Sequence, residues 1–132
     1  MAEKRTQLSQ TEHDKLVAMI ARERFSYEDR TTYTNPDGEQ NYAVNGEYPD
    51  IVAVKSGDTP IMGEVETEES VTEEESEQWK RYAALSGAIY LYVPKSKVSD
   101  AKAIIKSKKI GITELRSYEY ADGKFVITNV EM

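Results

Sequence analysis

The sequence predicts an α/β protein whose mixed central sheet is flanked by helices. Two compact apolar runs, Ile51–Val54 and residues 88–93, have the length and the β-branched or aromatic content of buried strands. Apolar residues recur at helical period in residues 10–24 and 97–108. Helical and strand patterns therefore alternate along the chain, which is typical of a sheet with helices packed on its faces.

The first half of the chain is predicted to begin with a helix and to continue as strands. Ser9 and Glu12 have the spacing of a capping box. The apolar stripe that follows consists of Leu16, Val17, Ile20 and Ala21. Turn signals lie at Asn45-Gly46 and at residues 56–58. The predicted elements are a helix over 10–24, strands over 41–45, 51–54 and 60–66, and an optional first strand over Thr31–Thr34.

The second half continues the alternation. Ser70 and Glu73 repeat the capping-box spacing, and Gly87 suits the position just past a helix end. Asp122-Gly123 is a hairpin turn signal. The predicted elements are helices over 71–86 and 97–108, the second with Val98, Ala101 and Ile105 facing inward, and strands over 88–93, 112–120 and 124–130. If the optional strand over Thr31–Thr34 is not counted, the order is α-β-β-β-α-β-α-β-β.

Composition limits the class of protein. A chain of 132 residues with 39% hydrophobic residues is expected to form one domain over residues 1–132. No apolar stretch is long enough to span a membrane, and the N-terminus lacks the apolar core of a secretory signal, so a cytoplasmic location is expected. The absence of cysteine excludes thiolate metal sites and cysteine nucleophiles. The single histidine, His13, excludes a multi-histidine metal site and makes a Ser-His-Asp site a poor candidate.

Charge is unevenly distributed along the chain. The net charge of −7 argues against a protein that coats DNA nonspecifically. Residues 64–77 hold eight acids and no base, whereas residues 95–109 hold six lysines and one acid. Residues 95–109 could therefore form a local basic face, although a solvated helix surface is the simpler interpretation. Four tyrosines at strand period could form a base-stacking platform, or could be half-buried sheet residues: Tyr90, Tyr92, Tyr118 and Tyr120.

Three carboxylates are predicted to converge. Glu64 and Glu66 lie on the same face of a strand, because residues two apart point the same way, and Val65 then faces the core. If strands 51–54 and 60–66 pair antiparallel, Asp50 lies opposite the end of the second strand. Oxygen ligands in this arrangement suit Mg²⁺ or Mn²⁺, and such a cation can polarise a phosphodiester. The alternative is an exposed strand end with mutually repelling acids.

The order of three short motifs resembles a known nuclease superfamily. Gln78 and Tyr82, four residues apart, share one face of a predicted helix, although each could be an ordinary surface or half-buried residue. Together Pro49-Asp50, Glu64-Val65-Glu66 and Gln78-Trp79-Lys80-Arg81-Tyr82 resemble the PD-(D/E)xK nucleases, the last motif resembling the Gln-x-x-x-Tyr helix of the RecB-like branch. The resemblance covers roughly residues 9–93. It implies a restriction-endonuclease-like αβββαβ core, here with an added C-terminal helix and β-hairpin.

The resemblance also implies roles for individual residues. Asp50 and Glu64, with the backbone carbonyl of Val65, are expected to hold Mg²⁺ or Mn²⁺. Gln78 and Tyr82 are expected to orient the site or to contact the DNA backbone. A glutamate of the first helix, Glu12 or Glu23, could join them. The expected function is Mg²⁺-dependent DNA endonuclease or exonuclease-like cleavage, in which a water activated by the cation attacks the phosphodiester. A homodimer or a partner subunit would supply recognition surface that so small a chain lacks.

Position 66 departs from the superfamily pattern. The chain has Glu66 where these nucleases usually carry a lysine, although some restriction enzymes of the superfamily work with Glu-x-Glu. Lys80 is not expected to replace that lysine, because on an ideal helix it points about 200° away from Gln78. Without metal the three acids should disfavour one another's ionisation. Two alternatives follow: a catalytically reduced member of the fold that binds nucleic acid or protein, and an acidic interaction module with no role in nucleic-acid chemistry.

Overall fold

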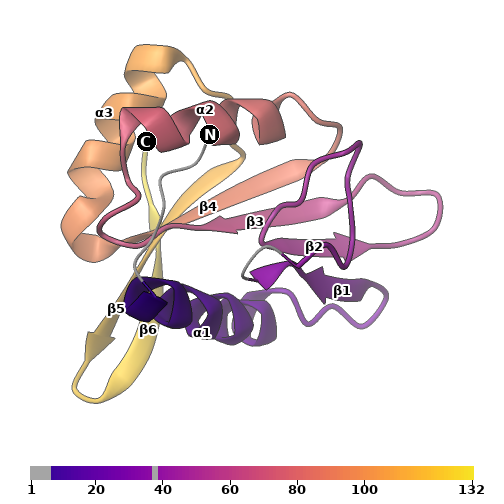
Figure 1. Ribbon diagram of the computed structural model, residues 1–132, viewed down its shortest axis with the longest axis horizontal. Helices are drawn as coiled ribbons and strands as arrows, with labels where there is room; N and C mark the ends of the chain where they lie inside the picture. Colours follow the sequence, from indigo (N-terminus) through magenta and orange to yellow (C-terminus); the bar gives the residue numbers. More distant parts are fainter. Residues whose placement is uncertain (1–6, 37–38) are drawn as a thin grey trace.

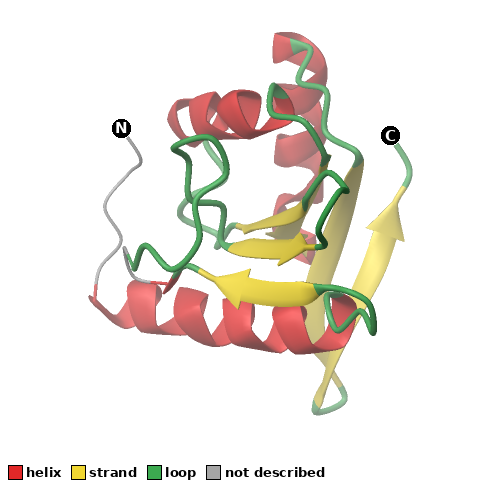
Figure 2. Cartoon of the chain, turned by 90° about the vertical axis from the view of Figure 1, so that its right-hand side faces the viewer, coloured by secondary structure: helices red, strands yellow, loops and turns green. Residues whose placement is uncertain are grey.

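A computed structural model describes residues 7–36 and 39–132, and within that part of the chain it contains three α-helices and one six-stranded mixed sheet (Figures 1 and 2). The helices are α1 (Gln7–Arg24), α2 (Glu73–Ala83) and α3 (Val98–Lys108), the last preceded by one 3₁₀ turn, η2 (Lys95–Lys97). The strands are β1 (Thr31–Thr34), β2 (Ile51–Val54), β3 (Ile61–Val65), β4 (Ala88–Pro94), β5 (Glu114–Ala121) and β6 (Lys124–Val130). The predicted mixed α/β class is confirmed.

The strands lie in the sheet in the order in which they occur in the sequence. β1, β2 and β3 pair antiparallel, β3, β4 and β5 pair parallel, and β5 and β6 form an antiparallel hairpin. Each parallel pair needs a crossover connection, and α2 and α3 supply the two crossovers. Figure 1 shows α1 on one face of the sheet and α2 with α3 on the other. The end of β3 therefore lies between α1 and α2.

The two faces of the sheet bury separate apolar clusters. Under α1, the predicted stripe packs on the sheet: Leu16, Val17 and Ile20 are buried and Ala21 is partly buried. They join Phe25, which follows the helix, and the sheet residues Ile51, Ala53, Val65, Tyr92 and Tyr118. Under α2 and α3, Trp79, Ala101 and Ile105 meet Leu91, Val93 and Leu115, with Val98 packed at the margin. The inward-facing residues predicted for both helices are thus confirmed. Within the described residues, no helix combines the length and apolar character needed to cross a membrane.

The predicted strand over residues 41–45 is wrong. Only one isolated bridge, between Val44 and Glu47, occurs there, around the confirmed Asn45-Gly46 turn. The side chain of Asn35 takes up the backbone groups that a strand ladder would use. Its amide nitrogen donates to the carbonyls of Tyr42 and Pro49 at 3.0 and 2.7 Å, and its oxygen accepts from the amides of Asn41 and Tyr42. A side chain therefore organises this segment.

Both predicted capping boxes are wrong. α1 begins at Gln7, so that Ser9 lies inside the helix. α2 is capped by Thr72, whose hydroxyl accepts from the Glu75 amide at 3.1 Å. The hydroxyl of Ser70 instead accepts from the Thr67 amide at 2.9 Å and closes the turn after β3. α2 also ends at Ala83, several residues before the predicted end, because the chain must turn into β4.

Candidate functional site

The start of β2 and the end of β3 bring Asp50 and Glu64 together. Ile51 pairs with Gly63 in the antiparallel register, which sets the preceding Asp50 opposite Glu64. The Asp50 amide donates to Glu64 Oε1 at 3.2 Å, and the Val65 amide donates to Asp50 Oδ2 at 2.8 Å. Both side chains are nearly enclosed, with Asp50 8% and Glu64 4% exposed. The structure thus places these two predicted residues, and the backbone of Val65, in one polar cluster.

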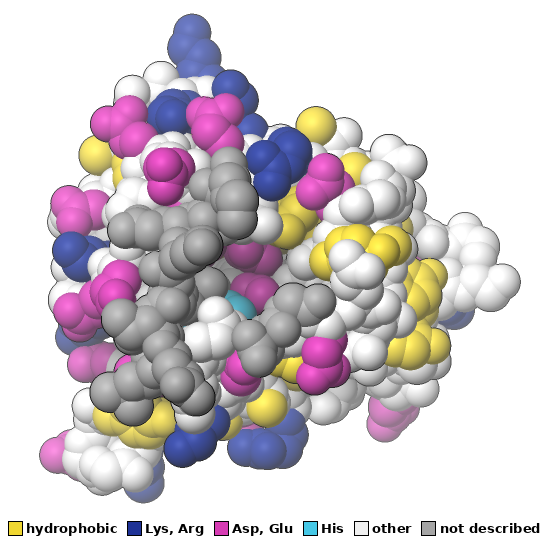
Figure 3. Space-filling view, viewed as in Figure 1, with side chains coloured by type: hydrophobic (Ala, Val, Ile, Leu, Met, Phe, Trp, Pro, Cys, Tyr) yellow, Lys and Arg dark blue, Asp and Glu magenta, His cyan; other side chains and the backbone are white. Residues whose placement is uncertain are grey.

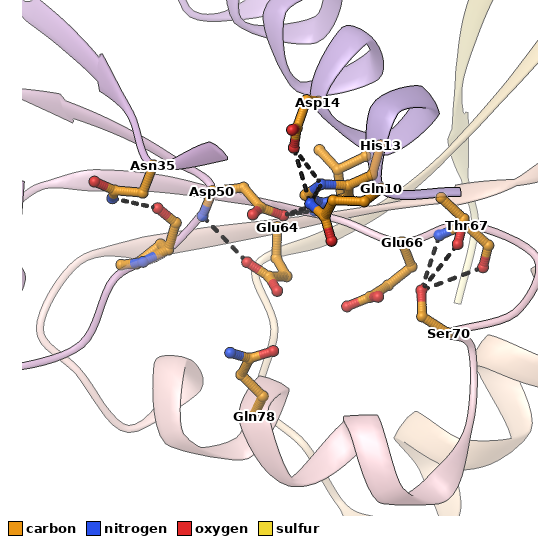
Figure 4. A network of polar contacts seen from close by, with 12 residues as sticks. Gln10, His13, Asp14, Asn35, Asp50, Glu64, Glu66, Thr67, Ser70 and Gln78 are labelled. Atoms are coloured by element: carbon orange, nitrogen blue, oxygen red, sulfur yellow. Dashed lines mark hydrogen bonds and ion pairs between the residues drawn. The ribbon is translucent and has the colours of Figure 1, made fainter. Parts of the chain in front are cut away.

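Glu66 and an unpredicted residue, Glu75, extend this cluster toward α2. One ligand atom from each of Glu64, Glu66 and Glu75 lies within 4.8 Å of the other two. All three side chains are buried. Figure 4 shows the carboxylates of Glu64 and Glu66 on the side of the sheet that α2 covers. Glu75 lies one helical turn before Gln78, and this three-residue spacing is the signal by which the sequence could have indicated it.

Gln78 and Tyr82 form a chain of hydrogen bonds that reaches the carboxylates from α2. In Figure 4 the Gln78 amide is drawn with its oxygen toward the carboxylates. We assign the reverse orientation, because Nε2 then donates to Glu64 Oε2 at 3.3 Å and to Glu75 Oε2 at 2.5 Å, and the amide oxygen accepts from the Tyr82 hydroxyl at 2.8 Å. The predicted pair therefore shares one face, with Gln78 in direct contact with the predicted carboxylate of Glu64 and Tyr82 behind Gln78.

The first helix contributes His13. His13 is 3% exposed, its Nε2 lies 3.1 Å from Asp50 Oδ2, and its Nδ1 lies 3.1 Å from Asp14 Oδ1. The predicted candidates Glu12 and Glu23 are both exposed. His13 lies one turn before Leu16 and Val17 on the buried stripe of α1, so the helical period could have placed it. In Figure 3 the single histidine is visible beside acidic side chains at the floor of a hollow.

Burial and like charge make the carboxylates poor acids. Burial, then the neighbouring carboxylates of Asp50 and Glu66, raise the pKa of Glu64 well above its ordinary value. Burial and the carboxylate of Glu75 raise the pKa of Glu66 to about 8, against the opposing effect of hydrogen bonds from Ser70 and Trp79. Both shifts favour the protonated form of the side chain, and a bound cation would oppose them by compensating the charge. The burial of Tyr82 likewise raises the pKa of its hydroxyl.

Within residues 7–36 and 39–132, neither Lys80 nor Lys108 takes the place of the lysine expected at position 66. Lys80 is exposed on the outer face of α2, as the helical angle predicts. Lys108 of the lysine-rich helix lies 2.9 Å from Glu77 and so neutralises an acid of α2.

A cavity of about 760 Å³ opens beside the cluster, between Glu12 on α1 and Thr67 after β3, and Tyr120 on its margin is 64% exposed. Tyr92 and Tyr118 are buried, so the four tyrosines do not form one exposed platform.

Two overlapping sets of atoms could hold a divalent cation. The first consists of Asp50 and Glu64, with His13 Nε2 adjacent to Asp50 and the backbone of Val65 bonded to Asp50 through its amide. The second consists of Glu64, Glu66 and Glu75. Both sets are dominated by the oxygen ligands that Mg²⁺ and Mn²⁺ prefer. In comparisons with known proteins, no family model, no curated protein and no solved structure matches this chain, so the function is argued from the geometry of the site.

Proposed function

We propose that this protein is a Mg²⁺- or Mn²⁺-dependent DNA nuclease of the PD-(D/E)xK type with a restriction-endonuclease-like core. The observation that carries the proposal is the meeting of Asp50 and Glu64 with the Gln78–Tyr82 pair. The three sequence motifs lie on separate elements, and the fold brings them within hydrogen-bonding distance of one another. The order α1-β1-β2-β3-α2-β4 also agrees with the αβββαβ order of that core.

The residues present fit a divalent cation. Carboxylates that raise one another's pKa need either a proton or a cation between them, and Glu64 is in this position beside Asp50 and Glu66. Asp50, Glu64 and the Val65 carbonyl would hold the cation, with His13 as an adjacent nitrogen donor. When bound, the cation would polarise the phosphodiester and lower the pKa of a water nucleophile. The lysine that these nucleases usually carry at the position of Glu66 is not needed as a ligand of such a cation.

The remaining side chains would position the ligands of that cation. Gln78 holds Glu64 and Glu75 through one amide nitrogen, and Tyr82 fixes the amide by donating to its oxygen. Asp14 lies beside Nδ1 of His13 and so orients the imidazole, which directs Nε2 toward Asp50. These contacts would hold the carboxylates in place for the cation. A site assembled in this way loses little entropy when the cation binds.

A second function is favoured by one specific observation, the carboxylate at position 66. Glu66 adds negative charge where the superfamily usually has positive charge, which weakens stabilisation of a developing phosphorane charge. A catalytically reduced member of the fold, binding nucleic acid or a protein partner, is consistent with that change. With a net charge of −7, the chain would gain affinity for DNA from a partner subunit that carries basic residues.

Nuclease assays separate the two functions. Single- and double-stranded DNA are incubated with the wild type and with Asp50→Ala and Glu64→Ala, in Mg²⁺, in Mn²⁺ and in EDTA. We expect cation-dependent cleavage that falls at least about 1000-fold in both variants, because the cation supplies several kcal/mol of transition-state stabilisation. Glu23→Ala removes an exposed acid of the same type and should cleave like the wild type.

The outcomes of this assay are distinct. Cleavage that survives both substitutions would place the activity elsewhere or attribute it to a contaminant. Binding of Mg²⁺ or DNA without cleavage would favour the catalytically reduced function. If Mg²⁺ and Mn²⁺ leave the thermal unfolding midpoint of the wild type unchanged, the acidic interaction module becomes the better description.

A further inference from the structure

The buried carboxylate of Glu66 is paired with the indole of Trp79. Trp79 Nε1 donates to Glu66 Oε2 at 2.8 Å, and both side chains are fully enclosed, at 0% exposure. The indole N–H is a donor only, and a bond from it to a carboxylate is charge-assisted when the carboxylate is ionised. Trp79 is the only tryptophan in the sequence. This bond joins α2 to the residue that follows β3.

Packing fixes the direction in which the indole N–H points. The ring of Trp79 belongs to the cluster under α2 and α3, whose other buried members include Leu91, Val93, Ala101 and Ile105. A ring enclosed by β4 and α3 in this way is closely packed, which limits its movement. Packing therefore sets the direction of the indole N–H, and the Glu66 carboxylate must lie where it can accept that hydrogen bond.

The backbone of Glu66 is held as firmly as its side chain. Its amide donates to the Tyr92 carbonyl at 2.9 Å, which continues the β3–β4 pairing by one residue. Its carbonyl accepts from the buried hydroxyl of Tyr118 at 2.7 Å. With the backbone fixed by β4 and β5 and one carboxylate oxygen fixed by Trp79, the Glu66 carboxylate keeps one place beside Glu64 and Glu75.

We propose that Trp79 is the positioning residue of the site: its indole N–H holds the Glu66 carboxylate against Glu64 and Glu75. The proposal rests on the nuclease function for its kinetic consequence and on the structure alone for the pairing. A lysine at position 66 would offer the buried indole only another donor. Glu66 and Trp79 therefore form a matched pair, and the superfamily lysine is replaced by a carboxylate whose position α2 determines.

NMR spectroscopy tests the pairing without any requirement for activity. One tryptophan gives one indole ¹H–¹⁵N cross-peak, so its assignment is immediate. In the metal-free protein at pH 9, where the Glu66 carboxylate is ionised, we expect this proton well downfield of a solvent-exposed indole, and we expect Glu66→Gln to move it upfield, since an amide oxygen is a weaker acceptor than a carboxylate. Tyr92→Phe, which removes a buried hydroxyl bonded to Arg116, should leave the peak in place. An indole peak that Glu66→Gln does not move would overturn the proposal.

Titration with Mg²⁺ then links the pair to the site. We expect the indole peak of the wild type to shift saturably with Mg²⁺ and to stay fixed in Asp50→Ala. If the peak responds to Glu66→Gln but not to Mg²⁺ in the wild type, the pairing stands and the metal-dependent function fails. The two results are therefore distinguishable.

Kinetics test whether Trp79 acts through Glu66. We expect Trp79→Phe to lower kcat at least about 10-fold with KM nearly unchanged, the size of effect that follows from a misplaced site group. In the Glu66→Gln background the same substitution should cost less than about 2-fold, because the group that Trp79 positions is already gone. Equal losses in both backgrounds would assign Trp79 a purely structural role. If Trp79→Phe does not fold, the Glu66→Gln NMR comparison decides the question.

Discussion

The two faces of the sheet each carry a polar cluster, half-buried on the α1 side and buried on the α2 side, and the two differ in whether their surroundings stabilise charge. On the α1 side, the guanidinium carbon of Arg116 lies 4.4 Å from the centre of the Tyr90 ring. The same guanidinium donates to the Tyr92 hydroxyl at 2.7 Å and to Glu114 at 3.0 Å. Although burial lowers the pKa of Arg116, its contacts with Tyr92 and Glu114 outweigh burial and raise it. The charged form of this cluster is stabilised by its surroundings.

The carboxylate cluster on the α2 side is the opposite case. Among the described residues, its hydrogen-bond donors include Gln78, Trp79 and backbone amides, and each of Glu64, Glu66 and Glu75 has the other two carboxylates beside it. Burial and like charge raise the pKa of Glu64 and Glu66, so the charged form is disfavoured. A protein that needed only stability would gain from an apolar replacement here. The contrast teaches that the surroundings of Arg116 favour its charged form, whereas the surroundings of Glu64 and Glu66 favour their protonated forms.

Glu66→Gln should give the largest stability change. Because the pKa of Glu66 is about 8 in the folded protein and near 4.5 when unfolded, the folded state binds the extra proton between these values. The metal-free wild type should therefore lose stability as pH rises through this window, by about 1.4 kcal/mol per pH unit for one proton. Glu66→Gln removes that dependence and should stabilise the metal-free protein by up to about 3 kcal/mol at pH 7. Urea unfolding at pH 5, 6, 7 and 8 measures both effects.

The control for this experiment is the cation itself. Saturating Mg²⁺ should restore the wild type relative to Glu66→Gln, because it supplies the compensating charge. A wild-type stability that does not fall between pH 5 and 8 would show that Glu66 is ionised in the folded protein without help. In that case the surroundings of Glu66, like those of Arg116, would stabilise the charged form of the side chain.

Arg116→Met should give the next largest change, and in the opposite direction. It leaves the buried Tyr92 hydroxyl without its donor and removes the cation from above the Tyr90 ring. We expect a loss of about 2 kcal/mol, the sum of a buried hydrogen bond and a cation–π contact. The loss should be the same at pH 5 and pH 8, because Arg116 is charged throughout. Urea unfolding checks this, and a loss that grows with pH would link Arg116 to the carboxylates.

Glu77→Gln should give the smallest change and sharpens the comparison within one helix. Glu77 is an exposed carboxylate of α2, and a hydrogen bond from Lys108, 2.9 Å away, lowers its pKa. The charged form of Glu77 is therefore favoured, unlike that of Glu66. We therefore expect a slight fall in the thermal unfolding midpoint that disappears at high salt. A rise in the midpoint would mean that the acids of α2 repel one another more than Lys108 compensates.

Local patterns predicted most elements, and they failed where a single side chain intervened. The strands at 51–54 and 88–93 and the inward faces of α1 and α3 followed from periodicity. The segment 41–45 has the composition of a strand, yet the Asn35 side chain takes its backbone hydrogen bonds. Thr72 displaced Ser70 as the cap of α2 because Ser70 closes the preceding turn. Such competition depends on where the neighbouring chain runs, and propensities do not contain that information.

For the site, the sequence by itself determined which residue types lie on which faces: Asp50 at a strand start, Glu64 and Glu66 on one side of a strand, and Gln78 and Tyr82 on one side of a helix. The superfamily resemblance remains a prediction. Only the tertiary structure decided that His13, Glu75 and Trp79 join these residues. The physical reason is that burial, unlike periodicity, depends on what covers each face. A carboxylate becomes a poor acid only once β3 is enclosed between α1 and α2.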